Sequence, residues 1–337
     1  MRALLAGAGA VGTRAARELL VDADVEHLAV HGRDRERVEA VTEGMGPRVV
    51  VSAGHRVRIP AGTDVVVVAR PAGTLAVARQ ALAAGAHVVT TSDHPDVVRQ
   101  LLGLDAVARQ AGRTVVVGAA MAPGLSCVLA RFAAGRVDKV SEVHVASFGT
   151  GGPACARRHH LALSSAGSEW RDGVWRRYPG GSGRELVWFP EPIGGADCYR
   201  AGLADPFLLA RAFPGAERIT ARMQATRRDR LTAPLPMLRR PHPEGALGGV
   251  RVQVMGWTGG AADAVVVGCA ARPALVAGVV AATAARWAVA GRLARSGAAG
   301  LAELVDEPGA FLRELRGRGI TVARFEGLSP GEVGAGV

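Results

Sequence analysis

The sequence predicts an α/β protein with a doubly wound parallel sheet, followed by a second α+β domain built on a mostly antiparallel sheet. Three observations support this fold class. Between residues 2 and 118, unbroken apolar runs alternate with amphipathic segments, as in parallel strands covered by helices on both faces. Between residues 138 and 270, apolar and polar residues mostly alternate within runs separated by Gly and Pro, which is typical of antiparallel strands. The length of 337 residues exceeds what one hydrophobic core usually serves.

The first domain opens with an apolar strand from residue 2, a glycine turn and an amphipathic helix with apolar positions at Ala15, Leu19 and Leu20. These parts begin a βαβ unit. The elements expected after them are a strand at 26–31, a helix at 34–44, strands at 47–52 and 63–70, a helix at 73–85, a strand at 86–91, a helix from 95 to about 111 and a strand at 114–118. Strands joined by helices in this way predict one parallel sheet.

The second domain is expected to carry the antiparallel sheet. Its predicted strands are at 139–148, 183–189, 217–226, 250–257 and 263–270. A long buried helix at 273–293, a helix around 310–316 and a last strand at 320–325 follow. We therefore place the first domain at 1–135, the second at 136–270, and at 271–327 a C-terminal segment that packs on either domain.

The net charge of +11 raises the question of a nucleic-acid partner. Lys139 is the only lysine among 41 basic residues, and no lysine-rich run or interleaved aromatic platform accompanies the arginines. We therefore expect no nucleic-acid binding. Arginine outnumbers acidic residues most strongly between residues 151 and 251, so a surface there is expected to attract a small anionic substrate.

The spacing of the cysteines and the length of the apolar runs indicate where in the cell the protein is expected. The four cysteines lie far apart with no C-x-x-C pair, which argues against a zinc site and a disulfide framework. We expect a cytoplasmic protein. The N-terminal apolar run is interrupted by glycine and leads directly into a helix, unlike a signal peptide. The longest later run, 273–285, is too short to span a bilayer, so no membrane partner is expected.

A glycine motif between the first strand and the first helix predicts dinucleotide binding in a Rossmann domain. Gly7, Gly9 and Gly12 match G-x-G-x-x-G. The first glycine permits the tight turn, the second lets the backbone approach the pyrophosphate, and the third allows close helix packing. Ala10 and Val11 complete the loop at the helix N-terminus, which favours the phosphates.

The end of the second strand indicates which dinucleotide is bound. An NAD-binding protein presents Asp or Glu to the ribose hydroxyls here, whereas this chain has Gly32 followed by Arg33. A missing carboxylate removes repulsion of a 2′-phosphate, and a guanidinium pairs with it. The sequence therefore favours NADP(H). In the alternative interpretation Asp34 takes the ribose role and Arg33 is solvated.

Two further strand ends carry candidate cofactor contacts. Arg70 and Pro71 stand where the fourth strand ends, at the carboxyl edge of the sheet, where ligands bind in such folds. Thr91 and Ser92 stand where the next strand ends, at the same edge. The alternative for this second segment is a helix N-cap by Ser92 or Asp93.

Two segments give a more specific resemblance. "GAHVVTTS" at 85–92 and "GAAMAPGLSCVLA" at 118–130, behind the glycine motif, resemble the saccharopine dehydrogenase family in its saccharopine reductase-like branch. The resemblance implies a Rossmann domain with an α/β substrate domain, NAD(P)-linked interconversion of an imine and a secondary amine, and carboxylate-bearing substrates held by arginines. It also implies that five residues lie beside the nicotinamide: Met121, Pro123, Gly124, Leu125 and Ser126.

Two segments of the second domain offer groups for proton transfer. His159 and His160 follow Arg157 and Arg158; an imidazole titrates near neutrality, and guanidiniums clamp anions. The alternative is a solvated basic turn or helix start. Tyr199 and Arg200 form the second candidate pair of proton donor and anion clamp. We expect no metal site, because adjacent histidines cannot share one face and no carboxylate stands at ligand spacing.

Together these observations predict an NADP(H)-dependent oxidoreductase that reduces an imine, or oxidises a secondary amine, on a small anionic metabolite. Two alternatives stay open: a C=O or C=C reductase of secondary metabolism with the same Rossmann domain, and a non-catalytic dinucleotide sensor. By analogy with the fold, we expect a homodimer formed through the sheet of the second domain.

Overall fold

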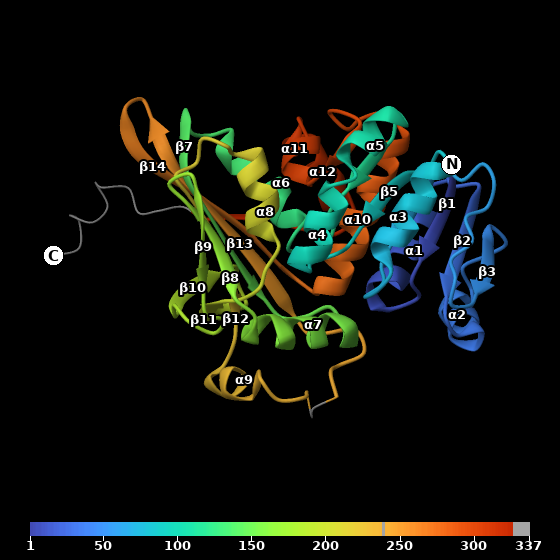
Figure 1. Ribbon diagram of the computed structural model, residues 1–337, viewed down its shortest axis with the longest axis horizontal. Coiled ribbons are helices and arrows are strands. Elements are labelled where there is room, and N and C mark those ends of the chain that lie inside the picture. The colour runs from blue at the N-terminus through green and yellow to red at the C-terminus, as the bar shows by residue number, and fades with distance from the viewer. Residues whose placement is uncertain (238–239, 326–337) are drawn as a thin grey trace.

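The computed structural model describes residues 1–237 and 240–325. Two sheets lie at opposite sides of the molecule with helices between them, as Figure 1 shows, where the N-terminal strands are blue and the second sheet stands at the left. The last two residues of the predicted C-terminal segment, 326 and 327, lie outside the described residues.

The first sheet is parallel throughout and has the strand order β15-β6-β5-β4-β1-β2-β3. Its strands are β1 (Arg2–Ala6), β2 (His27–Gly32), β3 (Val49–Ala53), β4 (Val65–Val68), β5 (His87–Thr90), β6 (Thr114–Val116) and β15 (Gly297–Ala299). The helices packed with this sheet are α1 (Ala10–Leu20), α2 (Arg35–Thr42), α3 (Thr74–Ala83), α4 (Pro95–Leu102), α5 (Asp105–Gln110) and α10 (Pro273–Val289). Apolar runs such as β4, buried along its whole length, form parallel strands because both faces are covered.

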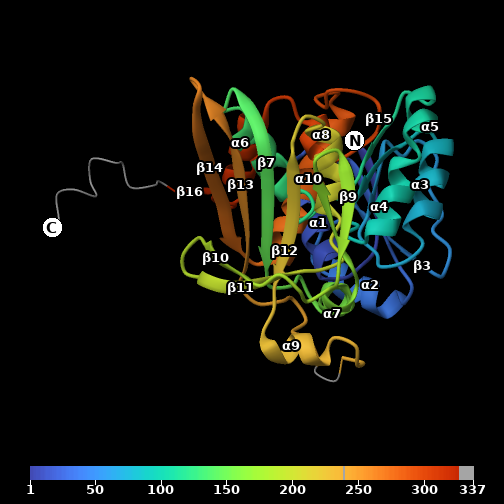
Figure 2. The same cartoon turned by 60° about the vertical axis from the view of Figure 1, so that its left-hand side comes forward.

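The second sheet has the order β10-β11-β12-β7-β13-β14-β16, and every pair except β12 with β7 is antiparallel. Its strands are β7 (Lys139–Phe148), β10 (Glu185–Phe189), β11 (Gly194–Arg200), β12 (Arg218–Gln224), β13 (Gly248–Thr258), β14 (Ala261–Ala271) and β16 (Ala323–Phe325), with β8 (Gly167–Arg171) on β12 and β9 (Val174–Tyr178) on β8. Figure 2 shows the long strands β7, β13 and β14 side by side. The predicted fold class is confirmed.

Six further helices complete the described chain: α6 (Leu125–Ala134), α7 (Pro153–Ser164), α8 (Asp205–Ala212), α9 (Arg227–Thr232), α11 (Leu301–Leu304) and α12 (Pro308–Gly317). α6 packs on β13 and β14, and α7 runs below the second sheet toward the first domain (Figure 1). The position of α7 therefore brings side chains of the second domain toward the first.

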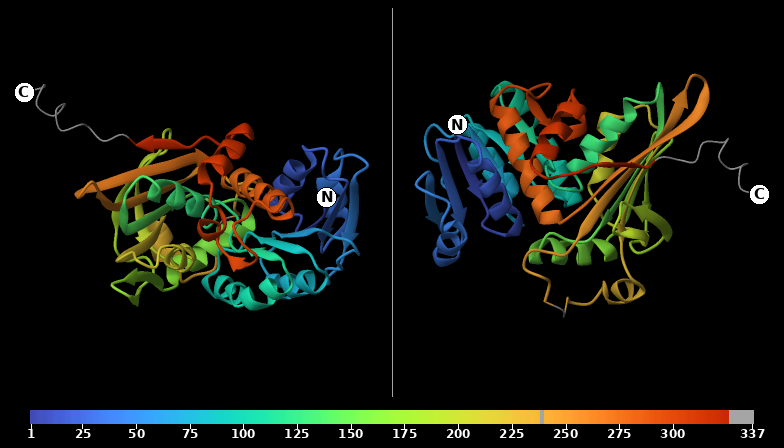
Figure 3. Two further views of the ribbon diagram at one scale, coloured as in Figure 1. Left: turned by 90° about the horizontal axis from the view of Figure 1, so that it is seen from above. Right: turned by 180° about the vertical axis from the view of Figure 1, so that it is seen from behind.

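The segment after residue 271 contacts both sheets. β15 extends the first sheet beside β6, whereas β16 pairs with β14 in the second, as the red strand in Figure 3 shows. α10 packs against α1, and a Cβ on Gly278 would lie 2.6 Å from the Cβ of Arg14, so only glycine allows this approach. The tail thus ties the two sheets together.

Two predicted helices differ in extent from those observed. The helix expected from 95 to about 111 is two helices, because α4 ends at Leu102 and is followed by Gly103, which disfavours helix continuation. The helix expected to reach residue 293 ends at Val289, and Gly291 follows with φ of +65°. Within the described residues, no helix combines the length and apolar character needed to cross a membrane.

Candidate active site

A cleft of about 880 Å³ opens at the carboxyl edge of the first sheet and reaches the start of α7. Of the residues singled out in the sequence, those lining it are Gly7, Gly9, Ala10, Val11, Arg33, Asp34, Arg70, Pro71, Thr91, Ser92, Met121, Arg157, Arg158 and His159. A Cβ on Gly152, just before α7, would lie 3.0 Å from the Cβ of Ala10. The second domain therefore closes directly over the glycine loop.

The glycine loop has the backbone that a dinucleotide site requires. Gly7 adopts φ of +129°, and a Cβ there would lie 2.2 Å from the carbonyl oxygen of Ala69. A Cβ on Gly12 would lie 1.8 Å from the oxygen of Gly7, so Gly12 serves packing and lies behind the cleft. Around a Cβ on Gly9 there is open space within 4 Å. That space is where the backbone can approach a pyrophosphate.

The tip of β2 has no room for an acidic side chain. A Cβ on Gly32 would lie 2.5 Å from Cγ2 of Val38, whose side chain is fully buried. Asp34 caps α2 by accepting a hydrogen bond from the backbone N–H of Arg37 at 3.3 Å. Arg33 and Arg37 both line the cleft beside it. This corner therefore presents two guanidiniums and one carboxylate that is partly used as a helix cap.

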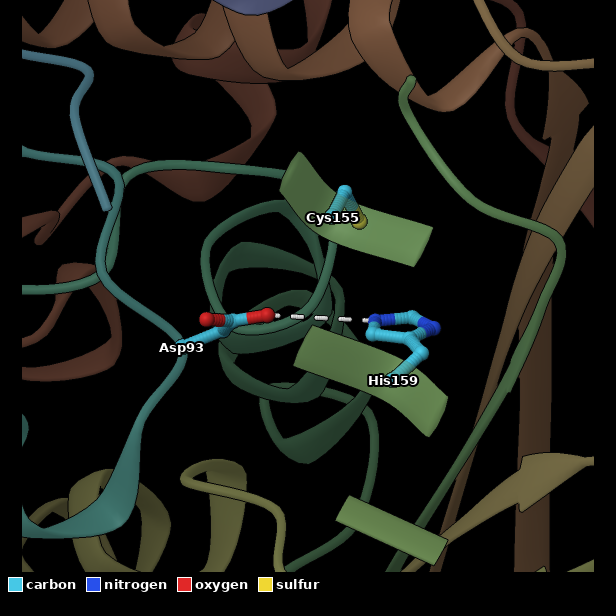
Figure 4. A group of neighbouring side chains, drawn as sticks. All are labelled: Asp93, Cys155 and His159. Atoms are coloured by element: carbon cyan, nitrogen blue, oxygen red, sulfur yellow. Dashed lines mark ion pairs between the residues drawn. The ribbon is translucent and has the colours of Figure 1, made fainter. Parts of the chain in front are cut away.

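Three polar side chains converge at the other end of the cleft (Figure 4). Asp93 comes from the loop after β5, and Cys155 and His159 come from neighbouring turns of α7. One ligand-type atom from each lies within 4.8 Å of the other two, and His159 Nε2 lies 3.8 Å from Asp93 Oδ2. The cluster therefore joins the first domain to α7.

The charges around His159 favour a positive centre at its imidazole. Burial alone would lower the pKa of His159. The neighbouring Cys155 and the charge of Asp93 outweigh burial and raise the pKa of His159 to about 9. The cluster therefore favours a protonated, positively charged imidazole at this end of the cleft.

Arg158 supports the carboxylate in this cluster. Its Nε lies 3.7 Å from Asp93 Oδ1, and one terminal nitrogen donates to the carbonyl oxygen of Gly202 at 2.6 Å. The guanidinium thus bridges the β5 loop and the segment before α8. Arg157 lines the cleft from the same helix. Of the three arginines proposed as anion clamps, Arg157 and Arg158 lie at the cleft and Arg200 does not.

A buried carboxyl stands behind the cluster. Ser126 Oγ donates a hydrogen bond of 2.6 Å to Asp205 Oδ1, at the start of α8. Burial raises the pKa of Asp205 to about 6, and the charge of Asp93 acts in the same direction. Ser126 is thereby engaged away from the cleft, whereas Met121 lines it.

Several predicted site residues lie outside the cleft. His160 does not line the cleft, and its Nε2 lies 2.7 Å from the carbonyl oxygen of Leu235. Tyr199 is buried in a small apolar core, and Arg200 Nε donates to Glu169 at 2.6 Å. The others outside are Gly12, Pro123, Gly124 and Leu125, which form turns or helix starts beside cleft residues. The structure thus brings His159, and not His160 or Tyr199, to the cofactor loop.

Sequence reasoning missed Asp93 and Cys155 as site residues. Cys155 stands four residues before His159, the spacing of one helix face, which was the available signal. The sequence held no signal for Asp93, because its contact with His159 depends on how α7 packs against the first domain. The residue that caps α4 is His94, whose Nδ1 accepts from Asp96 N–H, rather than Ser92 or Asp93. Asp93 is therefore free to face the cleft.

Comparison with solved structures identifies the fold. No family model matches the chain. Saccharopine dehydrogenase (L-Glu forming) from Saccharomyces cerevisiae superposes with a TM-score of 0.69 at 15% identity, over 96% of this chain and 100% of that one. DAP dehydrogenase of C. glutamicum superposes with a TM-score of 0.48 at 16% identity, over 94% of this chain and 98% of that one. GenD2 from gentamicin A biosynthesis, in complex with NAD, superposes with a TM-score of 0.46 at 15% identity, over 97% of each chain. The resemblance to saccharopine dehydrogenase is confirmed at the level of the fold.

Proposed function

We propose that this chain is an NADP(H)-dependent oxidoreductase that reduces an imine, or oxidises a secondary amine, on a small anionic metabolite. The observation that carries the proposal is one continuous cleft that contains both the glycine loop at Gly9 and the polar cluster around His159. The shared fold with an enzyme named saccharopine dehydrogenase supports the same chemistry.

The preference for NADP(H) is supported by the tip of β2. Val38 fills the space that a side chain at Gly32 would need, so the ribose carboxylate typical of NAD-binding proteins cannot stand there. Arg33 and Arg37 offer guanidiniums to a 2′-phosphate, and charge-assisted hydrogen bonds of this kind are roughly twice as strong as neutral ones. Binding of the 2′-phosphate is proposed to distinguish the two coenzymes.

An anionic substrate is supported by the arginines at the second-domain wall. Arg157 faces the cleft without an ion pair among the described residues, while Arg158 is held by Asp93 and Gly202. A carboxylate entering beside α7 would meet Arg157 first. We assign the substrate clamp to Arg157 and the support of Asp93 to Arg158.

Reduction of a C=N bond needs a positive centre that draws electrons toward nitrogen while hydride adds to carbon. Among the three predicted proton-transfer residues, His159 alone lines the cleft. We therefore assign this role to the cluster of Asp93, Cys155 and His159. The nicotinamide is proposed to lie between the cluster and Met121, with the substrate on the Arg157 side.

The proposal is tested by steady-state oxidation of NADPH with pairs of keto acids and amines. We expect turnover with at least one pair whose keto acid carries a second carboxylate. Gly9→Ala is the matched control, because a methyl group there blocks the cofactor while leaving the fold unstrained. If no pair supports NADPH oxidation although NADPH binding is measurable, the imine assignment is overturned.

A further inference from the structure

We propose that Asp93, Cys155 and His159 form a binding site for a divalent metal ion of the zinc type, with one coordination position open to the cleft. The geometry and ligand chemistry of the three side chains point to the metal site. Only its chemical role, as the positive centre for C=N reduction, rests on the proposed function. Figure 4 shows the three side chains pointing into one space between the β5 loop and α7.

The separations suit a single tetrahedral ion. The three ligand atoms lie within 4.8 Å of one another, and His159 Nε2 and Asp93 Oδ2 are 3.8 Å apart. An ion bound at about 2.0 Å by nitrogen and oxygen and about 2.3 Å by sulfur spaces its ligands roughly 3.3–3.8 Å apart. Small side-chain rotations of Cys155 and Asp93 would close the site. The positions of Cys155 and His159 on one helix face make the pair rigid.

The donor set selects the class of metal. A thiolate, an imidazole and a carboxylate are zinc ligands, whereas Ca²⁺ and Mg²⁺ take oxygen ligands almost exclusively. Three protein ligands with an open fourth position are typical of catalytic rather than structural zinc. The side chains of His159 and Asp93 are 14% and 28% exposed, so the site is sheltered yet reached from the cleft. Zn²⁺ is therefore the expected ion, with Co²⁺ as its spectroscopic substitute.

Neighbouring charges leave the site suited to a cation. Arg158 lies near Asp93 Oδ1, which turns the other oxygen toward His159 and holds the carboxylate in place, as supporting groups do around metal ligands. Its positive charge opposes that of the metal, but Asp93 and a metal-bound thiolate of Cys155 would supply two negative charges. Behind them Asp205 is a third carboxyl. These groups would compensate the charge of a dipositive ion.

Metal binding would replace the proton on His159 as the positive centre. The ion would act as a Lewis acid on the substrate nitrogen or oxygen at its open position, beside the cofactor loop. The two candidate electrophiles make different predictions for metal removal. A metal-dependent enzyme loses turnover with a chelator and recovers it with Zn²⁺, while an imidazolium-dependent enzyme does neither.

The test uses the full-length protein, reduced and freed of metal with a chelator, then titrated with Co²⁺ and Zn²⁺. We expect one equivalent of Co²⁺ to produce a thiolate-to-cobalt charge-transfer band, and Zn²⁺ to displace it. Cys155→Ser should abolish the band, and His159→Gln should weaken Zn²⁺ binding at least about 100-fold. His160→Gln and Asp96→Asn, which alter neighbouring side chains outside the cluster, should bind both metals as the wild type does.

Circular dichroism and NADPH calorimetry on each variant identify any that fail to fold. Absence of the band in folded wild-type protein, or an equal band in Cys155→Ser, would overturn the metal site. NADPH binding without metal binding leaves the proposed function intact and overturns this inference alone. Metal binding without NADPH binding overturns the proposed function and leaves the metal site standing.

Discussion

Asp93 Oδ2 lies 3.8 Å from His159 Nε2, so a loop of the first sheet and helix α7 meet across the cleft through these two side chains. Asp93→Asn removes the charge that supports the positive centre at His159. We expect kcat for NADPH-linked reduction to fall at least about tenfold with the Kd for NADPH unchanged. Asp96→Asn, an exposed change paired with Arg99 on α4, is the control. Wild-type turnover in Asp93→Asn would show that the contact has no role in the reaction.

Gly9 and Gly12 should respond differently to the same substitution. A Cβ on Gly9 meets open space, and its φ of −94° suits alanine, so Gly9→Ala should keep the melting temperature while losing NADPH binding. A Cβ on Gly12 would lie 1.8 Å from Gly7 oxygen, so Gly12→Ala should lower the melting temperature by several degrees. Thermal melts and calorimetry of both variants check this. Full NADPH affinity in Gly9→Ala would place the cofactor elsewhere.

Arg33→Ala should separate the two coenzymes. Loss of a charge-assisted hydrogen bond costs about 1.5–3 kcal/mol, so the Kd for NADPH should rise about tenfold or more, while the Kd for NADH stays the same. Arg35→Ala is the matched control, since Arg35 is exposed, pairs with Glu39 and does not line the cleft. Calorimetry with both coenzymes measures the effect. An equal loss for NADH would mean that Arg33 stacks on adenine rather than binding phosphate.

The buried carboxyl of Asp205 should make stability depend on pH. Burial raises its pKa to about 6 in the folded state, from an ordinary value of 3.8. Between these values the folded protein binds the proton more strongly than the unfolded chain, so the contribution of Asp205 falls as pH rises through this window. Asp205→Asn should remove this fall, on the order of 3 kcal/mol at most.

Urea unfolding at pH 4, 5, 6 and 7 measures that contribution as the difference between wild type and variant. The exposed Asp306→Asn is the control and should follow the wild-type profile. A difference between Asp205→Asn and wild type that stays constant with pH would show that Asp205 is ionised throughout.

Local patterns in the sequence predicted most of the first domain. The glycine motif fixed the βα turn, and the apolar runs predicted the strands, because each feature depends on neighbouring residues. The three-residue strand β15 was missed, because Gly297–Ala299 is too short to carry a periodic signal and gains its place from pairing with β6.

Only part of the candidate site could be predicted from the sequence. Gly32 and Arg33 lie next to a recognisable strand end, so their position at the cleft could be predicted. The contact of Asp93 with α7 could not, because it depends on how two domains pack. For the same reason Tyr199 seemed available for catalysis, although its ring is buried beside Met223 in the second domain.

Transfer of deuterium from NADPH dideuterated at C4 shows whether this chain adds hydride to the carbon of an imine. The protein is incubated with this coenzyme and the keto acid and amine pairs, and the products are analysed by mass spectrometry and NMR. We expect one deuterium on the carbon bonded to the new amine nitrogen, with no labelled product from Gly9→Ala. Deuterium on a carbon that bears no nitrogen, or no labelled product from any pair while NADPH binds, would contradict it.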